Sequence, residues 1–355
     1  HSISTSVFYA TVVALGGFIF GFDASVISGV VGFVTTEFRL NEIQQGFVVS
    51  APTLGAVAGS FLAGPMADKF GRKKILITIA ALYVISAILS AFATSYMMLV
   101  VARMIGGLAF ASLVLAPMYI AEIAPSKYRG KMISINQLNI VVGFSAAYFA
   151  NYYLLQMSSG TSDLAVSLGI TENVWRWMLG LEILPALAFL LLLFIIPESP
   201  RWLVCTGQKE KAQPILKKLF PEQNTEQLVQ QMVDQVGETH HSLFTKLKLL
   251  FSKHMRLILA VGLIVSISQQ ITGVNAVYFY APSIFEQSGI GQDAAFSQAI
   301  WVGIINVIFT IIAMLLIDKL GRKPLMLIGL AGVVVSMSVA AYGFHKATYQ
   351  SVSYT

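Results

Sequence analysis

The sequence has 355 residues, of which 56% are hydrophobic and 11% charged, and its formal net charge is +6 at pH 7. Because soluble globular domains are about 25% charged, this composition excludes an ordinary soluble domain. The positive charge does not indicate a nucleic-acid-binding protein either, since that function requires a solvated basic domain and the sequence has none.

Nine apolar runs are long enough to cross a membrane. A helix needs about 20 residues to span a hydrocarbon layer about 30 Å thick. The runs cover residues 6–33, 46–66, 75–95, 97–119, 132–154, 177–196, 255–285, 294–317 and 324–345. A transmembrane β-barrel would instead show segments of about ten residues with alternating hydrophobicity, and these are absent. The sequence therefore predicts an all-α polytopic membrane protein.

A short charged turn after the second run occurs again after the eighth. Residues 68–73 and 318–323 share the pattern Asp-Lys-x-Gly-Arg-Lys. An internal repeat at this distance is typical of transporters built from two similar halves, with the binding site between them. The first copy lies between the second and third of six runs. The second copy should likewise lie between the second and third helices of a second set of six. The repeat therefore predicts twelve helices, of which this sequence contains nine.

The basic residues indicate the orientation of the chain. Most of the 23 Lys and Arg residues fall on one side of the predicted spans, and the positive-inside rule makes that side cytoplasmic. We therefore expect a cytoplasmic N-terminus. Three parts are predicted: a six-helix N-terminal bundle at 1–197, a cytoplasmic helical linker domain at 198–254, and the first three helices of a C-terminal bundle at 255–355.

Four ionisable residues lie within or at the edge of the runs: Asp23, Arg103, Glu122 and Glu182. A central Asp or Arg costs about 2.5–3.5 kcal/mol to insert, so each needs a partner or a wet cavity. If Asp23 faces Arg103, protonation of the carboxylate would release the arginine, which predicts proton coupling. The alternative is a permanent structural salt bridge. Glu122 is expected to pair with Arg129 or the basic turn, and Glu182 to lie in the outer interface.

Three amides gather in the seventh run, at Gln269, Gln270 and Asn275. Gly273 and Pro282 predict a broken or bent helix, which would let all three face one cavity. Amides beside aromatic rings suit a sugar, because an amide bonds hydroxyls and a ring covers the apolar C–H face. The alternative is hydrogen bonding between helices, worth about 0.6 kcal/mol each. Two further amides are candidates on the same grounds: Gln137 and Asn306.

No catalytic constellation, phosphate-binding glycine loop or metal-ligand spacing is visible, so the sequence predicts neither an enzyme nor a cofactor or metal site. The two charged turns are expected to form a gate. Their recurrence in both halves favours charge networks that close the cytoplasmic mouth. The alternative is that they are solvated helix ends.

Taken together, these motifs resemble the sugar porters of the major facilitator superfamily, and in particular bacterial proton–monosaccharide symporters of the xylose type. The matching stretches follow the family's order over nearly all of the chain: 64–74, 103–107, 125–131, 197–203, 269–282 and 318–323. The resemblance implies two six-helix bundles, alternating access and a monomer in the bacterial inner membrane. The partners that it implies are a monosaccharide, a proton and the lipid bilayer.

The resemblance also assigns residues by position. It implies proton coupling at Asp23 with Arg103. Sugar contacts are implied at Phe20, Gln137, Gln269, Gln270, Asn275, Tyr280 and Asn306. A cytoplasmic gate is implied at Asp68, Arg72, Glu122, Arg129, Glu198, Arg201, Asp318 and Arg322.

Two positions bear on the activity. Facilitative glucose carriers of this family commonly have an amide where this sequence has Asp23, so the carboxylate favours symport over a proton-independent facilitator. A membrane sugar sensor is a third hypothesis. The tyrosine pair that follows the asparagine in the family is Phe279-Tyr280 here, which removes one hydroxyl and leaves the sugar preference open.

Overall fold

The computed structural model describes residues 2–160, 162–236 and 243–353, which contain helices and no strand. Nine helical segments within these ranges are long and apolar enough to cross a membrane. The predicted all-α polytopic fold and its nine spans are therefore confirmed. The predicted linker domain includes residues 237–242, which lie outside the described residues, and the three domain boundaries remain predictions.

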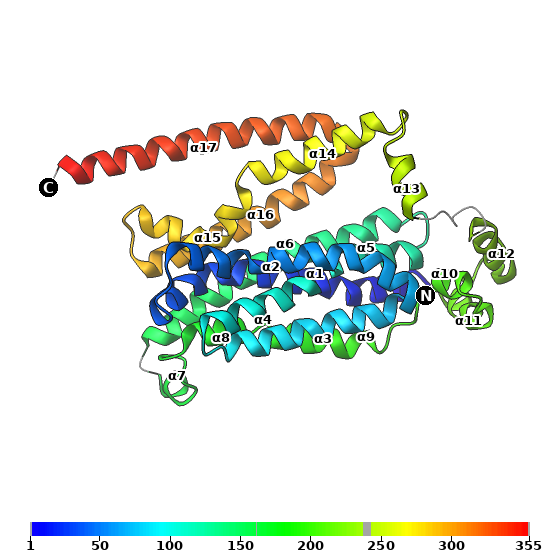
Figure 1. Ribbon diagram of the computed structural model, residues 1–355, viewed down its shortest axis with the longest axis horizontal. Helices are drawn as coiled ribbons and strands as arrows, with labels where there is room; N and C mark the ends of the chain where they lie inside the picture. The colour runs from blue at the N-terminus through cyan, green and yellow to red at the C-terminus, as the bar shows by residue number, and fades with distance from the viewer. Residues whose placement is uncertain (1, 161, 237–242, 354–355) are drawn as a thin grey trace.

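The first six spans pack side by side as a bundle (Figure 1). Three are single helices near the start of the chain, α1 (Ser2–Glu37), α2 (Glu42–Phe70) and α3 (Arg72–Ala91). The fourth span is broken into α4 (Tyr96–Ala109) and α5 (Ser112–Ile123). The fifth is α6 (Arg129–Ser159). After the short α7 (Asp163–Ser167), the sixth span is broken into α8 (Val174–Gly180) and α9 (Ile183–Leu193).

Glycines bring the helices of this bundle into close contact. A Cβ atom on Gly21 of α1 would overlap the carbonyl oxygen of Ile140 in α6, and one on Gly143 would overlap that of Phe18. Gly55 of α2 meets the backbone of α4 in the same way. Since lipid tails are as apolar as leucine, close van der Waals packing through small residues is a main source of helix association in a membrane.

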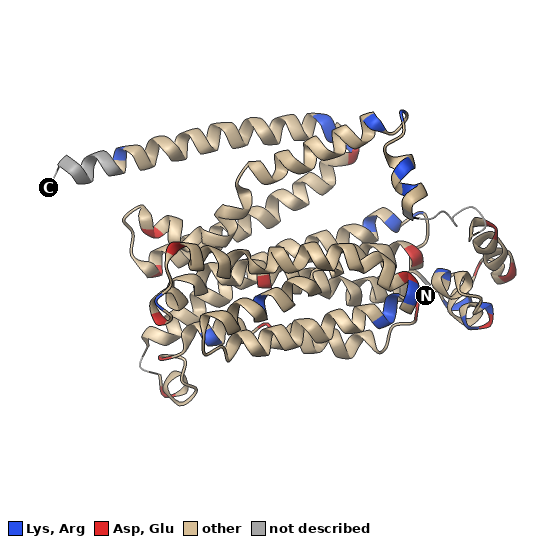
Figure 2. Cartoon of the chain, in the orientation of Figure 1, with Lys and Arg blue, Asp and Glu red and all other residues tan. Residues whose placement is uncertain are grey.

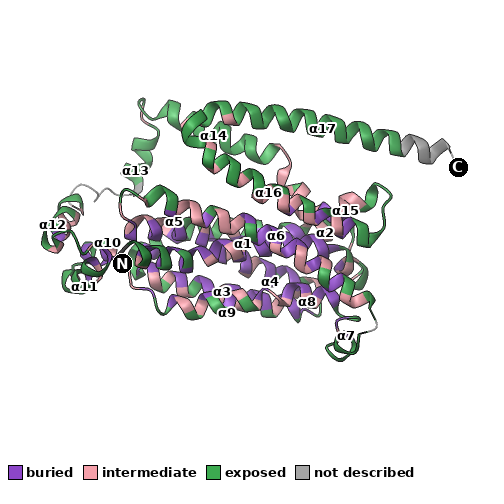
Figure 3. Cartoon of the chain, turned by 180° about the vertical axis from the view of Figure 1, so that it is seen from behind, coloured by how far each residue is buried: buried purple, intermediate pink, exposed green. Residues whose placement is uncertain are grey.

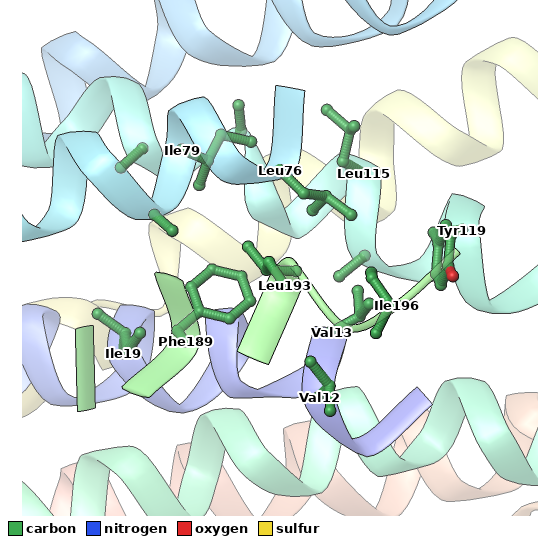
Figure 4. Close-up of a cluster of buried hydrophobic side chains, with 14 of the residues drawn as sticks. Val12, Val13, Ile19, Leu76, Ile79, Leu115, Tyr119, Phe189, Leu193 and Ile196 are labelled. Carbon is green, nitrogen blue, oxygen red and sulfur yellow. The ribbon is translucent and has the colours of Figure 1, made fainter. Parts of the chain in front are cut away.

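Apolar side chains fill the space between these helices. One cluster joins α1, α3, α5 and α9 near the end that carries the N-terminus, with Phe189 and Leu193 lying between Ile19 and Ile196 (Figure 4). A second cluster fills the opposite end around Val30, Leu99 and Trp175. Asp23 lies in α1 between Ile19 of the first cluster and Val30 of the second, so any charge there is enclosed by hydrocarbon.

Four short helices follow the sixth span: α10 (Pro200–Cys205), α11 (Lys209–Leu219), α12 (Thr225–Val236) and α13 (Leu243–Leu250). They lie at one end of the molecule, where most of the Lys and Arg residues are also found (Figure 2). Ser199 caps α10 by accepting a hydrogen bond from the backbone N–H of Trp202, and Pro200 occupies its first position, both of which favour a helix start.

The last three spans are α14 (Arg256–Ile271) with α15 (Val274–Gln287), α16 (Gln292–Leu320) and α17 (Arg322–Ser353). They contact the bundle only in part (Figure 3). The buried residues of α15 and α16 include Ala281, Phe296 and Ala299, all at the end away from the basic residues. Helix α14 has no buried residue. The two parts of the chain therefore meet at one end of the spans and separate toward the basic end.

The two charged turns have the same backbone. Gly71 and Gly321 both take a positive φ, 96° and 83°, and each N–H bonds to the carbonyl oxygen four residues earlier. Glycine adopts this conformation without the steric cost of a Cβ atom. A new helix begins at the next residue in both cases, at Arg72 and at Arg322. The repeat seen in the sequence is thus a repeat of structure.

Candidate transport site

Asp23 and Arg103 form an ion pair inside the bundle. The Nη1 atom of Arg103 donates to Oδ1 of Asp23 at 2.7 Å, and Nη2 donates to the backbone oxygen of Asp23 at 3.2 Å. Both side chains are almost fully enclosed, with 2% of Asp23 and 1% of Arg103 exposed. The predicted contact between these two residues is therefore present. The 2.7 Å bond between Arg103 and Asp23 is a charge-assisted hydrogen bond, which is stronger than a hydrogen bond between neutral groups.

Glu182 also belongs to this site, and its predicted place in the outer interface is wrong. Glu182 is only 2% exposed, and its carboxyl group interacts electrostatically with both Asp23 and Arg103. The reason is the break between α8 and α9: Glu182 occupies the turn between them and points into the bundle instead of along its surface. The sequence signal was present, since a carboxyl group in an apolar run needs a buried partner or water.

Three buried polar atoms of this group have no hydrogen-bond partner within the described residues: Oδ2 of Asp23, Nε of Arg103 and Oε1 of Glu182. A buried polar atom without a partner is costly. Two carboxyl groups beside one guanidinium can accommodate a single proton, which would convert an unpaired acceptor into a donor. The arrangement is therefore suited to taking up and releasing one proton.

The seventh span breaks where predicted. Gly273 has φ 77°, in the left-handed region, and it separates α14 from α15. Tyr280, two residues before Pro282, is the second point of non-helical backbone. The first break brings two of the amides together, since Nδ2 of Asn275 donates to Oε1 of Gln270 at 2.8 Å. The remaining N–H and lone pairs of this amide pair are available to a ligand.

Aromatic rings connect the amides to α1. Phe20 packs edge-on against Phe110 at 4.6 Å between ring centroids and against Phe144 at 6.4 Å. Phe144 in turn contacts Tyr278 of α15 at 5.1 Å. The hydroxyl of Tyr148 donates to the backbone oxygen of Tyr278 at 2.6 Å. The sequence analysis missed Tyr148, because nothing in its spacing distinguishes it from other aromatic residues.

The other residues predicted to contact the sugar are exposed or only half-buried. Gln137 of α6 and Gln269 of α14 are exposed, whereas Asn306 of α16 and Tyr280 are half-buried. Tyr280 lines a cavity of about 450 Å³ between the start of α2 and α15. Two buried amides that were not singled out, Asn136 and Asn151, each have an oxygen without a partner among the described residues.

A charge network surrounds the first turn at the basic end. Arg72 donates from Nε and Nη2 to the two carboxylate oxygens of Glu122 at 3.1 and 2.9 Å, and from Nη1 to Asp68 at 3.0 Å. The carboxylate of Glu198 accepts from the backbone N–H groups of Arg72 and Lys73. Glu122 therefore pairs with the basic turn, one of its two predicted partners. Because two N–H groups of the guanidinium bind the two oxygens of one carboxylate, this bidentate contact fixes the orientation of the Arg72 side chain.

The remaining predicted gate residues stay outside this network. Arg129 is exposed and forms no ion pair with any described residue. Of the two alternatives predicted for Glu122, the basic turn is therefore the one present, because Arg72 donates to both carboxylate oxygens. Asp318 and Arg322 are exposed, and they do not pair as Asp68 and Arg72 do. Arg201 is also exposed. Partial burial raises the pKa of the nearby Cys205 thiol, and the positive charge of Arg201 opposes that shift.

A polytopic helical fold with a buried ion pair and an amide-lined helix break defines a membrane transporter of small polar solutes. The chain belongs to the sugar (and other) transporter family, whose model matches residues 9–354. The arabinose-proton symporter of Bacillus subtilis (strain 168) is 38% identical over 351 residues, which cover 97% of this chain and 72% of that protein. The D-xylose-proton symporter of Escherichia coli (strain K12) is 36% identical over 375 residues, covering 96% and 73%.

Solved structures show the same fold. The proton:xylose symporter XylE of the major facilitator superfamily, bound to 6-bromo-6-deoxy-D-glucose, superposes with a TM-score of 0.77 at 35% identity, over 91% of this chain and 71% of that chain. A partially occluded inward open form of the xylose transporter XylE from E. coli gives a TM-score of 0.76 at 34% identity, over 92% and 73%. The fold is that of the major facilitator superfamily.

Proposed function

We propose that this chain moves a monosaccharide across the membrane together with a proton, by alternating access. The observation that carries the proposal is the buried Asp23–Arg103 pair with Glu182 beside it. Asp23 lies one helical turn after Phe20, whose ring leads through Phe144 to the amide-bearing α15. Protonation of the carboxyl group and occupation of the sugar site therefore act on the same stretch of α1. The symporters named above, at 36–38% identity, are consistent with this activity.

In this proposal the amides bind the sugar. Gln270 and Asn275 hold each other in place across the helix break and present their free N–H and lone-pair positions to sugar hydroxyls. Gln137, Gln269, Asn306 and Tyr280 would complete the site from neighbouring helices. Phe20 would cover the apolar face of the ring, a role for which aromatic side chains are suited.

The separation of the two parts of the chain at the basic end supports a conformation in which the transport pathway is open on that side. The two parts of the chain meet through Phe296 and Ala299 at the far end, while α14 has no buried residue. We assign the basic side to the cytoplasm, which places the N-terminus inside and makes this state inward-facing. Residues of the first charged turn and its network, Asp68, Arg72, Glu122 and Glu198, would form the fixed part of a cytoplasmic gate. We propose a monomer in the bacterial inner membrane.

The test is Asp23→Asn in membrane vesicles energised to about 100 mV, inside negative. Such a potential supplies roughly 2.3 kcal/mol per proton, which corresponds to about fifty-fold accumulation of sugar at 1.4 kcal/mol per decade. The variant should equilibrate sugar without concentrating it, while exchange across the membrane persists. Asp163→Asn, an exposed acid of α7, is the matched control and should concentrate sugar normally. Accumulation by Asp23→Asn would refute the coupling role.

A proton-independent facilitator is the second candidate, because a buried ion pair can also be a permanent structural element. The two functions differ in one measurement. Adding sugar to a weakly buffered suspension of de-energised vesicles should make the medium more alkaline if a proton enters with each sugar. A facilitator would produce no change in pH. The signal should disappear when a proton ionophore is present.

A further inference from the structure

A cavity at the basic end has no part in the proposed sugar pathway. It has a volume of about 360 Å³ and lies where α1, α3, the segment after α9 and α11 come together. Its walls are mostly apolar, with Tyr9, Ile195, Ile215 and Leu219 among them. Among the residues that the structure describes, the charged ones that line it are two lysines, Lys73 and Lys218, and none is acidic.

Both lysines contact neighbouring groups that do not neutralise their charge. The Nζ atom of Lys73 donates to the backbone oxygen of Phe194 at 3.1 Å, which uses one of its three N–H donors. The Nζ atom of Lys218 stands over the ring of Tyr9, 5.7 Å from its centroid. Neither ammonium forms an ion pair with any residue that the structure describes. The cavity therefore offers an anion two positive charges, that of Lys73, positioned by a hydrogen bond, and that of the exposed Lys218 beside the Tyr9 ring.

The surroundings show which anion fits. The last turn of α9 and the two residues after it expose large apolar side chains, with Leu191 65%, Phe194 58% and Ile195 62% exposed. In a membrane-spanning helix this face contacts lipid. Ile195 also lines the cavity, so hydrocarbon and the two ammonium groups meet at one place, where the chain leaves the membrane. A free phosphate ion would use the lysines but gain nothing from the apolar walls.

We propose that this cavity binds an anionic phospholipid of the cytoplasmic leaflet, with its phosphate between Lys73 and Lys218 and an acyl chain along Ile195 and the exposed face of α9. Positively charged pockets between helices on the cytoplasmic side are suited to lipid head groups. The side is the one assigned under the proposed orientation, but the site does not depend on sugar transport.

The position of the site gives the lipid a structural role. Lys218 belongs to α11, which lies outside the membrane spans, and Lys73 belongs to α3. The backbone N–H of Lys73 also donates to Glu198, just before α10. A phosphate shared by the two lysines would therefore tie α11 to the bundle beside the charge network of the first turn. The lipid would then act as a clamp on the cytoplasmic helices.

The test is a titration of the delipidated full chain with phosphatidylglycerol, followed by native mass spectrometry in a mild detergent. Each lysine near an anionic lipid contributes about a five-fold gain in binding. Lys73→Gln and Lys218→Gln should each weaken binding about five-fold, and the double variant roughly 25-fold. The matched controls are Lys74→Gln and Lys217→Gln. These residues are exposed sequence neighbours that do not line the cavity, and their variants should bind as the parent does.

Three outcomes would overturn the proposal. Equal weakening by the control variants would show a diffuse basic surface instead of a site. Competition by inorganic phosphate at equal concentration would show an anion site without lipid specificity. Equal binding of phosphatidylcholine, which has no net charge, would show that the lysines do not select the head group. A second readout is proteolysis of α11 and α12, which phosphatidylglycerol should slow in the parent and not in the double variant.

Discussion

The Asp23–Arg103 pair allows a double substitution to separate a structural role from a coupling role. Removing one partner of a buried ion pair costs about 3–5 kcal/mol, because the other charge stays buried and unpaired. Asp23→Asn should fall at the lower end of this range for three reasons: an amide oxygen can still accept from Arg103, the bond from Nη2 to the backbone oxygen, 3.2 Å long, remains, and the carboxyl group of Glu182 still interacts with the guanidinium. Replacing both partners by neutral groups of similar size is often close to neutral.

The double variant Asp23→Asn, Arg103→Met should therefore regain most of the stability that Asp23→Asn loses, to within about 1 kcal/mol of the parent. Stability is measured by thermal unfolding of the purified protein in detergent, and accumulation of sugar is measured in energised vesicles. We expect the double variant to be stable, to exchange sugar and not to concentrate it. If the stable double variant still concentrates sugar, the Asp23–Arg103 pair is only structural and the assignment of coupling to Asp23 fails, which leaves Glu182 as the carboxyl group of this site that carries the proton.

Three further predictions concern other parts of the chain. Gly55→Ala should lower the melting temperature, because its Cβ atom would overlap the backbone of α4 and overpacking costs about 1–3 kcal/mol. Gly64→Ala in the same helix should raise stability by about 0.5–1 kcal/mol, because its Cβ atom would meet no described atom within 4 Å beyond its chain neighbours and the adjacent helix backbone. Gln270→Ala and Asn275→Ala should each weaken sugar binding about five- to ten-fold, measured by calorimetry, and less than multiplicatively together because they bond to each other. Maleimide should label Cys205 more slowly at pH 7.5 than it labels a small-molecule thiol, because burial raises the pKa of Cys205 and the thiolate is the reactive form.

Much of the fold could be predicted because its signals are local. Length and apolarity define each span, and Gly273 marks the break in the seventh. The contact between Asp23 and Arg103, 80 residues apart, was predictable for a different reason: a charge in hydrocarbon needs an opposite charge, and few are available.

The places of Glu182 and Glu122 could not be predicted, because they depend on helix breaks and helix packing that spacing along the sequence does not show. Glu182 was assigned to the interface from its distance to the end of the span, whereas the break between α8 and α9 turns it inward. Glu122 had two cationic candidates on the same side of the membrane. Only the packing of α3 against α5 decides that Arg72 reaches it and Arg129 does not. The sequence alone cannot choose between two possible partners on the same side of a membrane, because the choice depends on how each helix is rotated about its axis.

The two charged turns indicate how a gate of this kind can work. They share one backbone, yet only the first is surrounded by partners, because α5 supplies Glu122 and Glu198 precedes α10. That network is complete although α14, in the other part of the chain, is unburied at the same end. The network of the first turn is therefore intact while the two parts of the chain are separated at the basic end. Asp318 and Arg322 are exposed and lack the pairing of their counterparts. We propose that a moving gate would set the exposed charges of Asp318 and Arg322 against the network of the first turn, so that the two similar turns would serve different purposes.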